Sequence, residues 1–538
     1  MQLIIKKIIN VMKKIILLFA LLITTVFYSS AQTITWADDV ACIVYTHCTR
    51  CHNNTPNSIA ALSFVSYNDM YSQRHAIDLY IDNGNMPPFL TSNKHHRFVD
   101  EKSLTQKEID LIHQWVKQGC VQGNVANAPT PPVIALPQPT FSAPDISVRV
   151  PNFTVPITTT ENFRQCFILT NPSTAVKYLS AIEVVPNTLR AIYSVYVYAD
   201  TSSIPVAKDS ADTSLGFENF GSISPSAKPL FGWMNGSLPY YYPTSFGLQI
   251  DSGSRIIAQV DYAEDAGGKV DSTLINLQFS PVLRAIESKL ILSHNNNLIH
   301  PPFLVKADSV QTISESYTVN TDQSFYGVMP MLHYLCTQLN VIAVSPLNDT
   351  TNLADIPYWG AIWSQGYFMY NQPIHIKAGS TIYATATFDN TYLNNNNPNN
   401  PPQNITGGST ADDEEMLFYF QLSSYAIGDE TTVMLDSTPH LAHYLNCQAT
   451  HTPSGVEEIQ NNEINIFPNP CNEELRIAID ELRLKNSGVE IYDLVGRKVL
   501  TLLNQKSEII NVSALPAGIY LLKIISDKKT FTQKFTKQ

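Results

Sequence analysis

The sequence predicts a multidomain fold, with a small all-α domain, two antiparallel β-sandwiches and a small C-terminal β-sandwich in that order. The chain has 538 residues, which is too many for one ordinary hydrophobic core. Its 33 prolines and its many Asn and Thr residues stand between short apolar runs, in a chain with 26 Tyr and 23 Phe. This mixture favours strands and turns. Helical periodicity marks residues 36–125 instead, and a Pro-rich linker follows at residues 126–144.

The first 31 residues have the layout of a secretory signal peptide. Two lysines precede the apolar run 15–28, and Ser29-Ser30-Ala31 offers small residues for cleavage. The run is too short and wrongly flanked for a membrane span, so an uncleaved anchor is the less favoured alternative. Because Met12 would itself make a normal start, the sequence leaves open whether residues 1–11 are expressed. We expect an exported protein with no permanent span in the mature chain.

The charge of the chain argues against a nucleic-acid partner. The net charge is −12 at pH 7, and charged residues make up only 15% of the chain. Neutralising phosphates requires clustered Lys and Arg, and no basic stripe with interleaved aromatic residues is present.

Residues 36–125 are expected to be helical, and 104–119 is the clearest helix. Thr105 can cap it, because Glu108 follows three residues later as in a capping box. Gly119 ends the helix. The apolar residues that recur at helical spacing are Ile109, Ile112, Trp115 and Val116.

The same region contains Cys48-Thr-Arg-Cys51-His52, a C-x-x-C-H motif typical of c-type haem attachment. Two thiols one helical turn apart can each add to a vinyl group of one porphyrin, and His52 then presents an imidazole to the iron. A zinc site would need a second ligand pair, and a thioredoxin-like dithiol site would need a βαβ frame; neither stands out. We therefore expect covalent haem c on Cys48, Cys51 and His52.

Met86 is the best candidate for the second axial ligand of the iron. A thioether opposite an imidazole raises the haem potential and suits electron transfer. The alternative is that Met86 is a gap-filling methionine before a turn. Four histidines are rival ligands: His47, His75, His95 and His96.

The helical region is similar to small cytochromes c and to the cytochrome-like units of secreted oxidoreductases. The resemblance rests on 48–52, on Met86-Pro87-Pro88 and on the helix end 115–119. It implies electron transfer with a redox partner that the sequence does not identify.

Eight cysteines lie after residue 40, and in an exported chain some should pair. Cys42 and Cys120 flank the helical domain and are its natural disulfide candidates. The sequence does not decide the pairing of the four others outside the haem motif, which are Cys166, Cys336, Cys447 and Cys471.

Residues 145–450 have the pattern of many short strands. Apolar and polar residues alternate in 190–198, 255–262 and 381–388, and loops rich in Gly, Asn and Pro separate such segments. This length and pattern predict two antiparallel sandwiches, at 145–300 and 301–450.

This β region resembles the copper type II, ascorbate-dependent monooxygenases, the family of peptidylglycine and dopamine hydroxylating enzymes. The resemblance implies two copper sites, one per sandwich, facing each other across a cleft. It is carried by the order and spacing of several stretches: 162–169, 253–262, Gly267-Gly268, 363–365, 378–380, 388–390, 397–402 and 408–416.

The resemblance also implies that the first copper site is absent here. The family's adjacent histidine pair falls on Tyr193 and Ser194, and its third histidine falls on Asp261. Imidazole is the proper ligand for a redox copper, and these three residues cannot replace it as a set.

The second copper site is altered but recognisable through the resemblance. The family's Pro-His-x-His falls on 330–333, where Met331 and His333 alternate along a strand, and Met416 falls on the family's methionine ligand. Such a set would favour Cu(I). The alternative is that this copper site has been lost, and that both methionines are core residues and His333 is an ordinary histidine. Two hypotheses follow: a redox enzyme with one copper ion, or a catalytically inactive binding scaffold that carries a cytochrome.

Residues 464–538 resemble the sorting domain of the type IX secretion system. The matching stretches are Phe467-Pro-Asn-Pro470, 491–499, 515–523 and the basic end 534–537. The resemblance implies the type IX machinery as a partner, cleavage near residue 460, and release or attachment at the cell surface. The alternative is a small β domain that stays on the mature protein and binds something.

Overall fold

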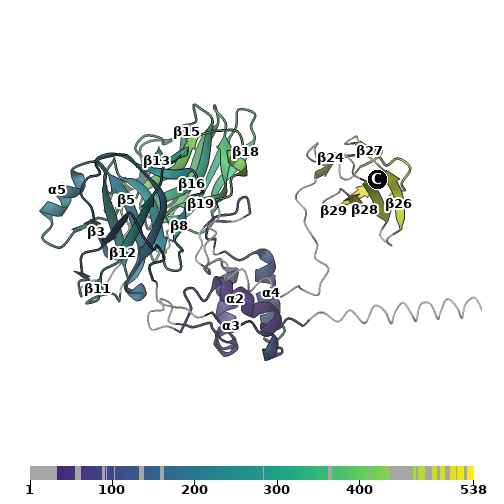
Figure 1. Ribbon diagram of the computed structural model, residues 1–538, viewed down its shortest axis with the longest axis horizontal. Coiled ribbons are helices and arrows are strands. Elements are labelled where there is room, and N and C mark those ends of the chain that lie inside the picture. Colours follow the sequence, from purple (N-terminus) through teal and green to yellow (C-terminus); the bar gives the residue numbers. More distant parts are fainter. Residues whose placement is uncertain are drawn as a thin grey trace, which may run out of the picture. The chain divides into compact units, whose positions relative to one another are not determined.

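A computed structural model of the protein describes residues 33–54, 62–87, 91–92, 94–101, 103–132, 138–157, 163–263, 265–282, 284–360, 366–410, 412–434, 465–467, 471–478, 488–493, 497–502, 509–516, 518–525 and 530–537. The signal-peptide prediction lies outside these residues. The chain divides into two compact units, residues 1–451 and 452–538. The helices predicted as a separate domain belong to the first unit together with the β-sandwiches (Figure 1). No helix among the described residues is long and apolar enough to cross a membrane.

The helical region has one hydrophobic core, built around Trp36, Met70 and Trp115. Its elements are η1 (Trp36–Val40), α2 (Ala41–His47), α3 (Tyr67–Asp82), α4 (Gln106–Lys117) and η2 (Val125–Asn127). The capping box predicted at Thr105 is confirmed, because Thr105 accepts from Glu108 N and the Glu108 carboxylate accepts from Thr105 N. Ser66 and Asp69 form a second capping box at the start of α3.

A nine-stranded sheet runs through both sandwiches. Its path is β1-β12-β4-β9-β13-β22-β16-β19, and β8 pairs with β4. The two halves join where β9 pairs in parallel with β13. The strands are β1 (Ile146–Arg149), β4 (Lys177–Val185), β8 (Tyr240–Tyr241), β9 (Phe246–Ile250), β12 (Leu274–Phe279), β13 (Arg284–Ser293), β16 (Gln323–Leu332), β19 (Phe368–Ile376) and β22 (Met416–Ser424).

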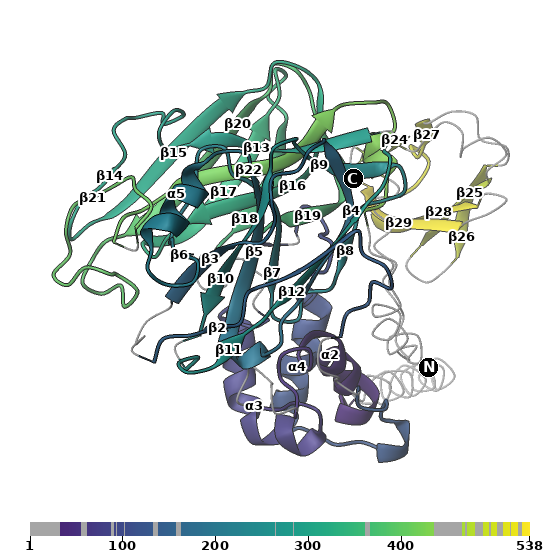
Figure 2. The same cartoon turned by 60° about the vertical axis from the view of Figure 1, so that its left-hand side comes forward.

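Two smaller sheets complete the predicted sandwiches, each covering one half of the long sheet (Figure 2). The first is β3 (Phe163–Ile168), β5 (Ile192–Asp200), β6 (Phe217–Glu218), β7 (Lys228–Met234) and β10 (Arg255–Tyr262). The second is β15 (Val310–Thr318), β17 (Cys336–Val344), β18 (Thr350–Ile356) and β20 (Thr381–Asp389). Short elements outside these sheets are β2 (Phe153–Thr154), β11 (Val270–Asp271), β14 (Leu304–Val305), β21 (Ile405–Thr406), η3 (Leu189–Ala191), α5 (Ile204–Ala211) and η5 (Asp429–Thr431).

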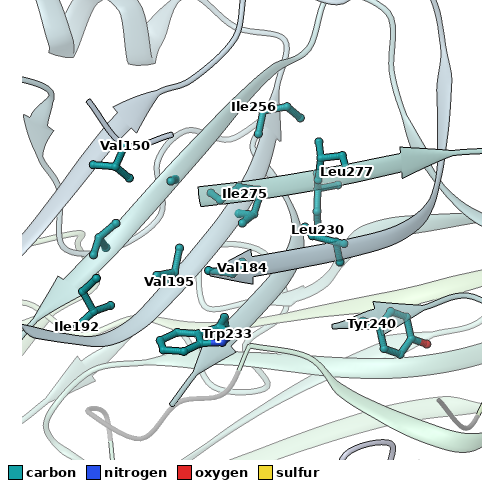
Figure 3. Close-up of a cluster of buried hydrophobic side chains, with 14 of the residues drawn as sticks. Val150, Val184, Ile192, Val195, Leu230, Trp233, Tyr240, Ile256, Ile275 and Leu277 are labelled. Carbon is teal, nitrogen blue, oxygen red and sulfur yellow. The ribbon is translucent and has the colours of Figure 1, made fainter. Parts of the chain in front are cut away.

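Three apolar layers hold these sheets together. The core of the first sandwich contains Val195, Trp233 and Ile275 (Figure 3). A separate core fills the second sandwich. A third layer packs the outer face of the five-stranded sheet, including Tyr196 and Ile257, against β16 and β22. The five-stranded sheet is therefore buried on both faces, which brings its polar side chains close to those of the second sandwich.

The second unit consists of two small sheets. A three-stranded sheet contains β23 (Asn465–Phe467), β24 (Glu474–Ala478) and β27 (Ile509–Asn511). A four-stranded sheet contains β25 (Gly488–Asp493), β26 (Lys498–Leu502), β28 (Gly518–Ile525) and β29 (Thr530–Lys537). Leu475, Val489 and Phe535 are fully buried in a common core, in agreement with the predicted small β domain.

Candidate functional site

The C-x-x-C-H motif forms a helical turn directly after α2. Cys48 N donates to Val44 O (2.9 Å), and His52 N donates to Cys48 O (2.8 Å). Thr49 Oγ1 and Asn53 Nδ2 donate to the carbonyls of Tyr45 and Thr49. These bonds wind 48–52 as one turn, which is the arrangement that the motif predicts for its two thiols and its imidazole.

One nitrogen of the His52 ring is engaged in a hydrogen bond. Nδ1 lies 3.1 Å from Leu62 O, so Nδ1 carries the proton and donates it. Burial lowers the pKa of His52, which favours this neutral form. The ring also stacks on Phe64, with centroids 4.3 Å apart. Nε2 is therefore the nitrogen left for iron, and a carbonyl on the opposite nitrogen is the usual support of a metal-ligating histidine.

Neither Cys48 nor Cys51 of the motif is in a disulfide. Burial raises the pKa of Cys48 to about 12, with smaller contributions from Cys51 and Glu108. A dithiol redox site needs a depressed thiol pKa, so this environment disfavours that alternative. Within the described residues no group of three His, Cys, Asp or Glu could hold a metal ion.

Met86 is half-buried just beyond α3, where its N–H donates to Tyr80 O. Two rival ligands are engaged elsewhere: His96 Nε2 lies 2.6 Å from Asn352 O, and His47 Nε2 lies 3.2 Å from Glu108. The other rivals, His75 and His95, are exposed. Met86 remains the predicted second ligand.

The predicted Cys42–Cys120 disulfide is wrong. Cys42 is disulfide-bonded, but Cys120 is a buried free thiol. Cys120 follows α4 in a left-handed conformation (φ 58°), and its thiol lies near Arg74 and Asp78 of α3. The two cysteines flank the same domain in sequence, but flanking positions do not bring the thiols together.

The positions of the first copper site hold a buried ion pair instead. Arg164 Nε lies 2.7 Å from Asp261 Oδ1, and Ser194 Oγ donates to Asp261 Oδ2 (2.6 Å). Burial raises the pKa of Asp261, and Arg164 partly offsets this effect. Arg164 also donates to Phe220 O and lies over the Phe220 ring. Asp261 is thus committed to a guanidinium, which is incompatible with a cation at the same carboxylate oxygens.

The three residues of the second copper site do not lie together. In the β16–β22 pairing Leu332 faces Met416 and Met331 faces Leu417, so Met331 and Met416 point to opposite faces of the sheet. Met416 is fully buried in the core of the second sandwich. Met331 packs with the layer between the sandwiches. The predicted Met, His, Met set therefore does not fit one copper ion.

Met331 and His333 instead line a pocket between the two sandwiches. His333 Nδ1 lies 3.0 Å from Asp413 O, and burial lowers the pKa of His333 to about 4. Its Nε2 is thus an acceptor, 3.8 Å from Glu415 Oε2. The other residues that line this pocket include Arg164, Tyr196, Tyr198, Phe220, Gln259 and Glu415.

Three polar atoms in this pocket are buried without a hydrogen-bond partner among the described residues: His333 Nε2, Tyr198 OH and Gln259 Oε1. Gln259 Nε2 donates to the carbonyls of Asn219 and Phe220, which fixes Oε1 as the free acceptor. Sequence reasoning missed Arg164, Gln259 and Glu415. The signal that could have found Gln259 was a polar residue inside the buried strand β10, and Glu415 directly precedes the buried strand β22.

Comparison with known proteins identifies only the C-terminal unit. Residues 465–538 match the secretion system C-terminal sorting domain. No curated protein matches the chain.

Solved structures share very little with this chain. It is 11% identical to a β-glucuronidase of Faecalibacterium prausnitzii, covering 43% of this chain and 38% of that one, with a TM-score of 0.14. It is 9% identical to the adhesin domain of Epf from Streptococcus pyogenes, covering 43% and 73%, with a TM-score of 0.12. It is 8% identical to the BSP domain of a biofilm-associated protein, covering 73% of this chain and 80% of that one, with a TM-score of 0.15. At these TM-scores none of them assigns a fold or an activity. The chain thus carries a type IX secretion sorting domain and is an exported, secreted or cell-surface protein.

Proposed function

We propose that this chain is an exported electron-transfer protein that holds covalent haem c, and that its β-sandwiches are a catalytically silent binding scaffold. The observation that carries the first part is the turn at 48–52. It presents two cysteines that are not in a disulfide and a neutral imidazole whose Nδ1 donates to Leu62 O. This is the donor arrangement that c-type attachment needs.

Four residues of the helical region would hold the haem. Cys48 and Cys51 would hold the porphyrin through thioether bonds, His52 Nε2 would bind the iron, and Met86 is the candidate second ligand. The bound haem would supply one-electron transfer. Leu62 O keeps His52 in the correct tautomer, and Phe64 limits the rotation of its ring.

Apolar surface near the predicted ligands supports this assignment. Leu62, which holds His52, is 43% exposed, and Leu79 and Tyr80, just before Met86, are 56% and 50% exposed. An apolar macrocycle bound by His52 and Met86 would offer such side chains an apolar surface to pack against.

Expression of the full chain in a host with periplasmic haem ligation tests the first part. We expect wild-type protein to retain a Soret band after denaturation, because covalent haem does not dissociate. Cys48→Ser with Cys51→Ser should abolish that band. The matched control is Cys120→Ser, which changes another free thiol of the same region and should keep the band.

The pocket between the sandwiches supports the scaffold. Since His333 Nε2 and Gln259 Oε1 are acceptors, a ligand there would need N–H or O–H donors. Metal analysis of the full chain distinguishes the scaffold from the alternative of a one-copper redox enzyme. We expect no stoichiometric copper at micromolar supply. One copper per chain that is lost in His333→Ala would support the redox enzyme and overturn the scaffold.

A further inference from the structure

The carboxylate of Asp100 joins the predicted haem-attachment turn to the first sandwich. Its Oδ1 accepts from Arg50 Nη1 at 2.6 Å, and its Oδ2 accepts from the backbone N–H of Leu238 at 3.1 Å. Arg50 lies between the two motif cysteines. The Arg50 and Asp100 side chains are only 10% and 20% exposed, so solvent screens their interaction weakly.

A second contact lies directly at the cysteine that precedes His52. Cys51 Sγ is 3.6 Å from Asn235 O, and Arg50 Nη1 is 3.4 Å from Gly236 O. Gly236 has a φ of +82°, and a Cβ added there would lie 3.3 Å from both Cys51 Sγ and Arg50 Cβ. The turn after β7 therefore packs against the Cys51 side of the motif.

The backbone that carries Asp100 is itself anchored to the long sheet. Val99 N donates to Met369 O and Asn371 N donates to Arg97 O, both at 2.8 Å. Phe98 is buried in the core of the second sandwich and Val99 in that of the first. Asp100 has a left-handed φ of 52°, a conformation that Asp adopts more readily than most non-glycine residues.

We propose that Asp100 is a positioning residue that fixes the haem-attachment turn on the first sandwich and, as the counter-charge of Arg50, sets the reduction potential of the attached haem. The proposal rests on the proposed function. Loss of the Asp100 anion makes the net charge beside the haem more positive, which disfavours the more positive ferric state and raises the potential. Loss of the Arg50 cation lowers the potential for the same reason.

Spectroelectrochemical titration of the haem-loaded full chain tests the proposal with three variants. Asp100→Asn keeps the size of the side chain and should shift the ferric–ferrous equilibrium about tenfold toward the ferrous state, which is 59 mV for one electron. Arg50→Gln should shift it by a similar factor in the opposite direction. The double variant should return close to wild type, because both charges are then absent.

A matched control is Asp308→Asn. Asp308 shares the left-handed backbone of Asp100, with a φ of 50°, but is exposed in the loop before β15. This variant should leave the potential unchanged. Amide hydrogen exchange at 48–54 gives a second measurement, and we expect faster exchange in Asp100→Ala than in Asp308→Ala.

The two possible failures are distinguishable. If wild-type protein carries no haem, the proposed function fails and the inference fails with it. If haem is attached but the two single variants move the potential in the same direction, the variants only loosen the turn and the proposal is overturned. Unchanged potentials in both variants would overturn it as well.

Discussion

The haem-attachment turn and the predicted copper positions differ in how their residues are brought together. Cys48, Cys51 and His52 lie within one helical turn, and backbone hydrogen bonds place them. Met331 and Met416 come from two strands, and their pairing sends them to opposite faces of one sheet. A site within one turn is fixed by local geometry, whereas a site built across strands depends on the phase of each strand. A one-residue difference in that phase removes a ligand.

The largest effect is expected at the ion pair that replaces the first copper site. Asp261→Asn should lower the free energy of unfolding by about 3–5 kcal/mol, because it leaves the Arg164 cation buried without its counter-charge. Chemical denaturation of the full chain measures this loss. A variant as stable as wild type, with a new metal bound at that position, would show that the pair is not structural.

The two methionines predicted for the second copper site should differ in how much they contribute to stability. Met416→Ala should destabilise the protein by about 2–5 kcal/mol, because Met416 is fully buried in a packed core. Met331→Ala should cost much less, because Met331 is half-buried beside a pocket. Denaturation curves of the two variants give the difference. Equal losses, together with loss of bound copper in both, would contradict the separation of the two side chains.

The buried Glu315 should make the stability of the second β-sandwich depend on pH. It is buried, both of its oxygens lack a hydrogen-bond partner among the described residues, and burial raises its pKa from 4.5 to about 9. The folded state therefore keeps a proton that the unfolded state releases near pH 4.5, so this group costs stability as the pH rises from 4.5 toward 9.

Glu315→Gln should remove that loss. At pH 8 we expect the variant to be more stable than wild type by about 1–3 kcal/mol in free energy of unfolding, and therefore to unfold at a higher temperature. At pH 4 we expect the two proteins to unfold at nearly the same temperature. Thermal unfolding at both pH values measures the difference, with Glu287→Gln as the control, because Glu287 is only half-buried and pairs with Lys289. A wild-type stability that does not fall between pH 5 and 8 would contradict a buried neutral Glu315.

The smallest effect is expected in the helical region. Thr105→Ala should cost about 1 kcal/mol, because Thr105 caps α4 through Glu108 N and orients the Glu108 carboxylate. Thr105→Ser keeps the hydroxyl and serves as the control. Thermal unfolding that distinguishes neither variant from wild type would show that α4 does not limit the stability of this region.

The sequence was most informative where structure is local. The α4 capping box, the alternating strands such as 381–388 and the C-terminal sorting domain were all predicted, because short-range periodicity or a contiguous family pattern marks them. The Cys42–Cys120 disulfide was wrong because sequence position says little about the direction of a side chain.

Contacts between distant segments could not be predicted. Asp100 meets Leu238, and Arg164 meets Asp261, only after separate strands and loops have packed. Charge and hydropathy patterns do not record such pairings.

Peptide mapping of the mature protein tests the central claim most directly. After expression with haem ligation, protease digestion and mass spectrometry should find one haem mass on the peptide that contains Cys48, Cys51 and His52. All other peptides should be unmodified by haem. The unmodified peptide with both thiols free, from a host that attaches haem to a control cytochrome in the same culture, would contradict the electron-transfer account.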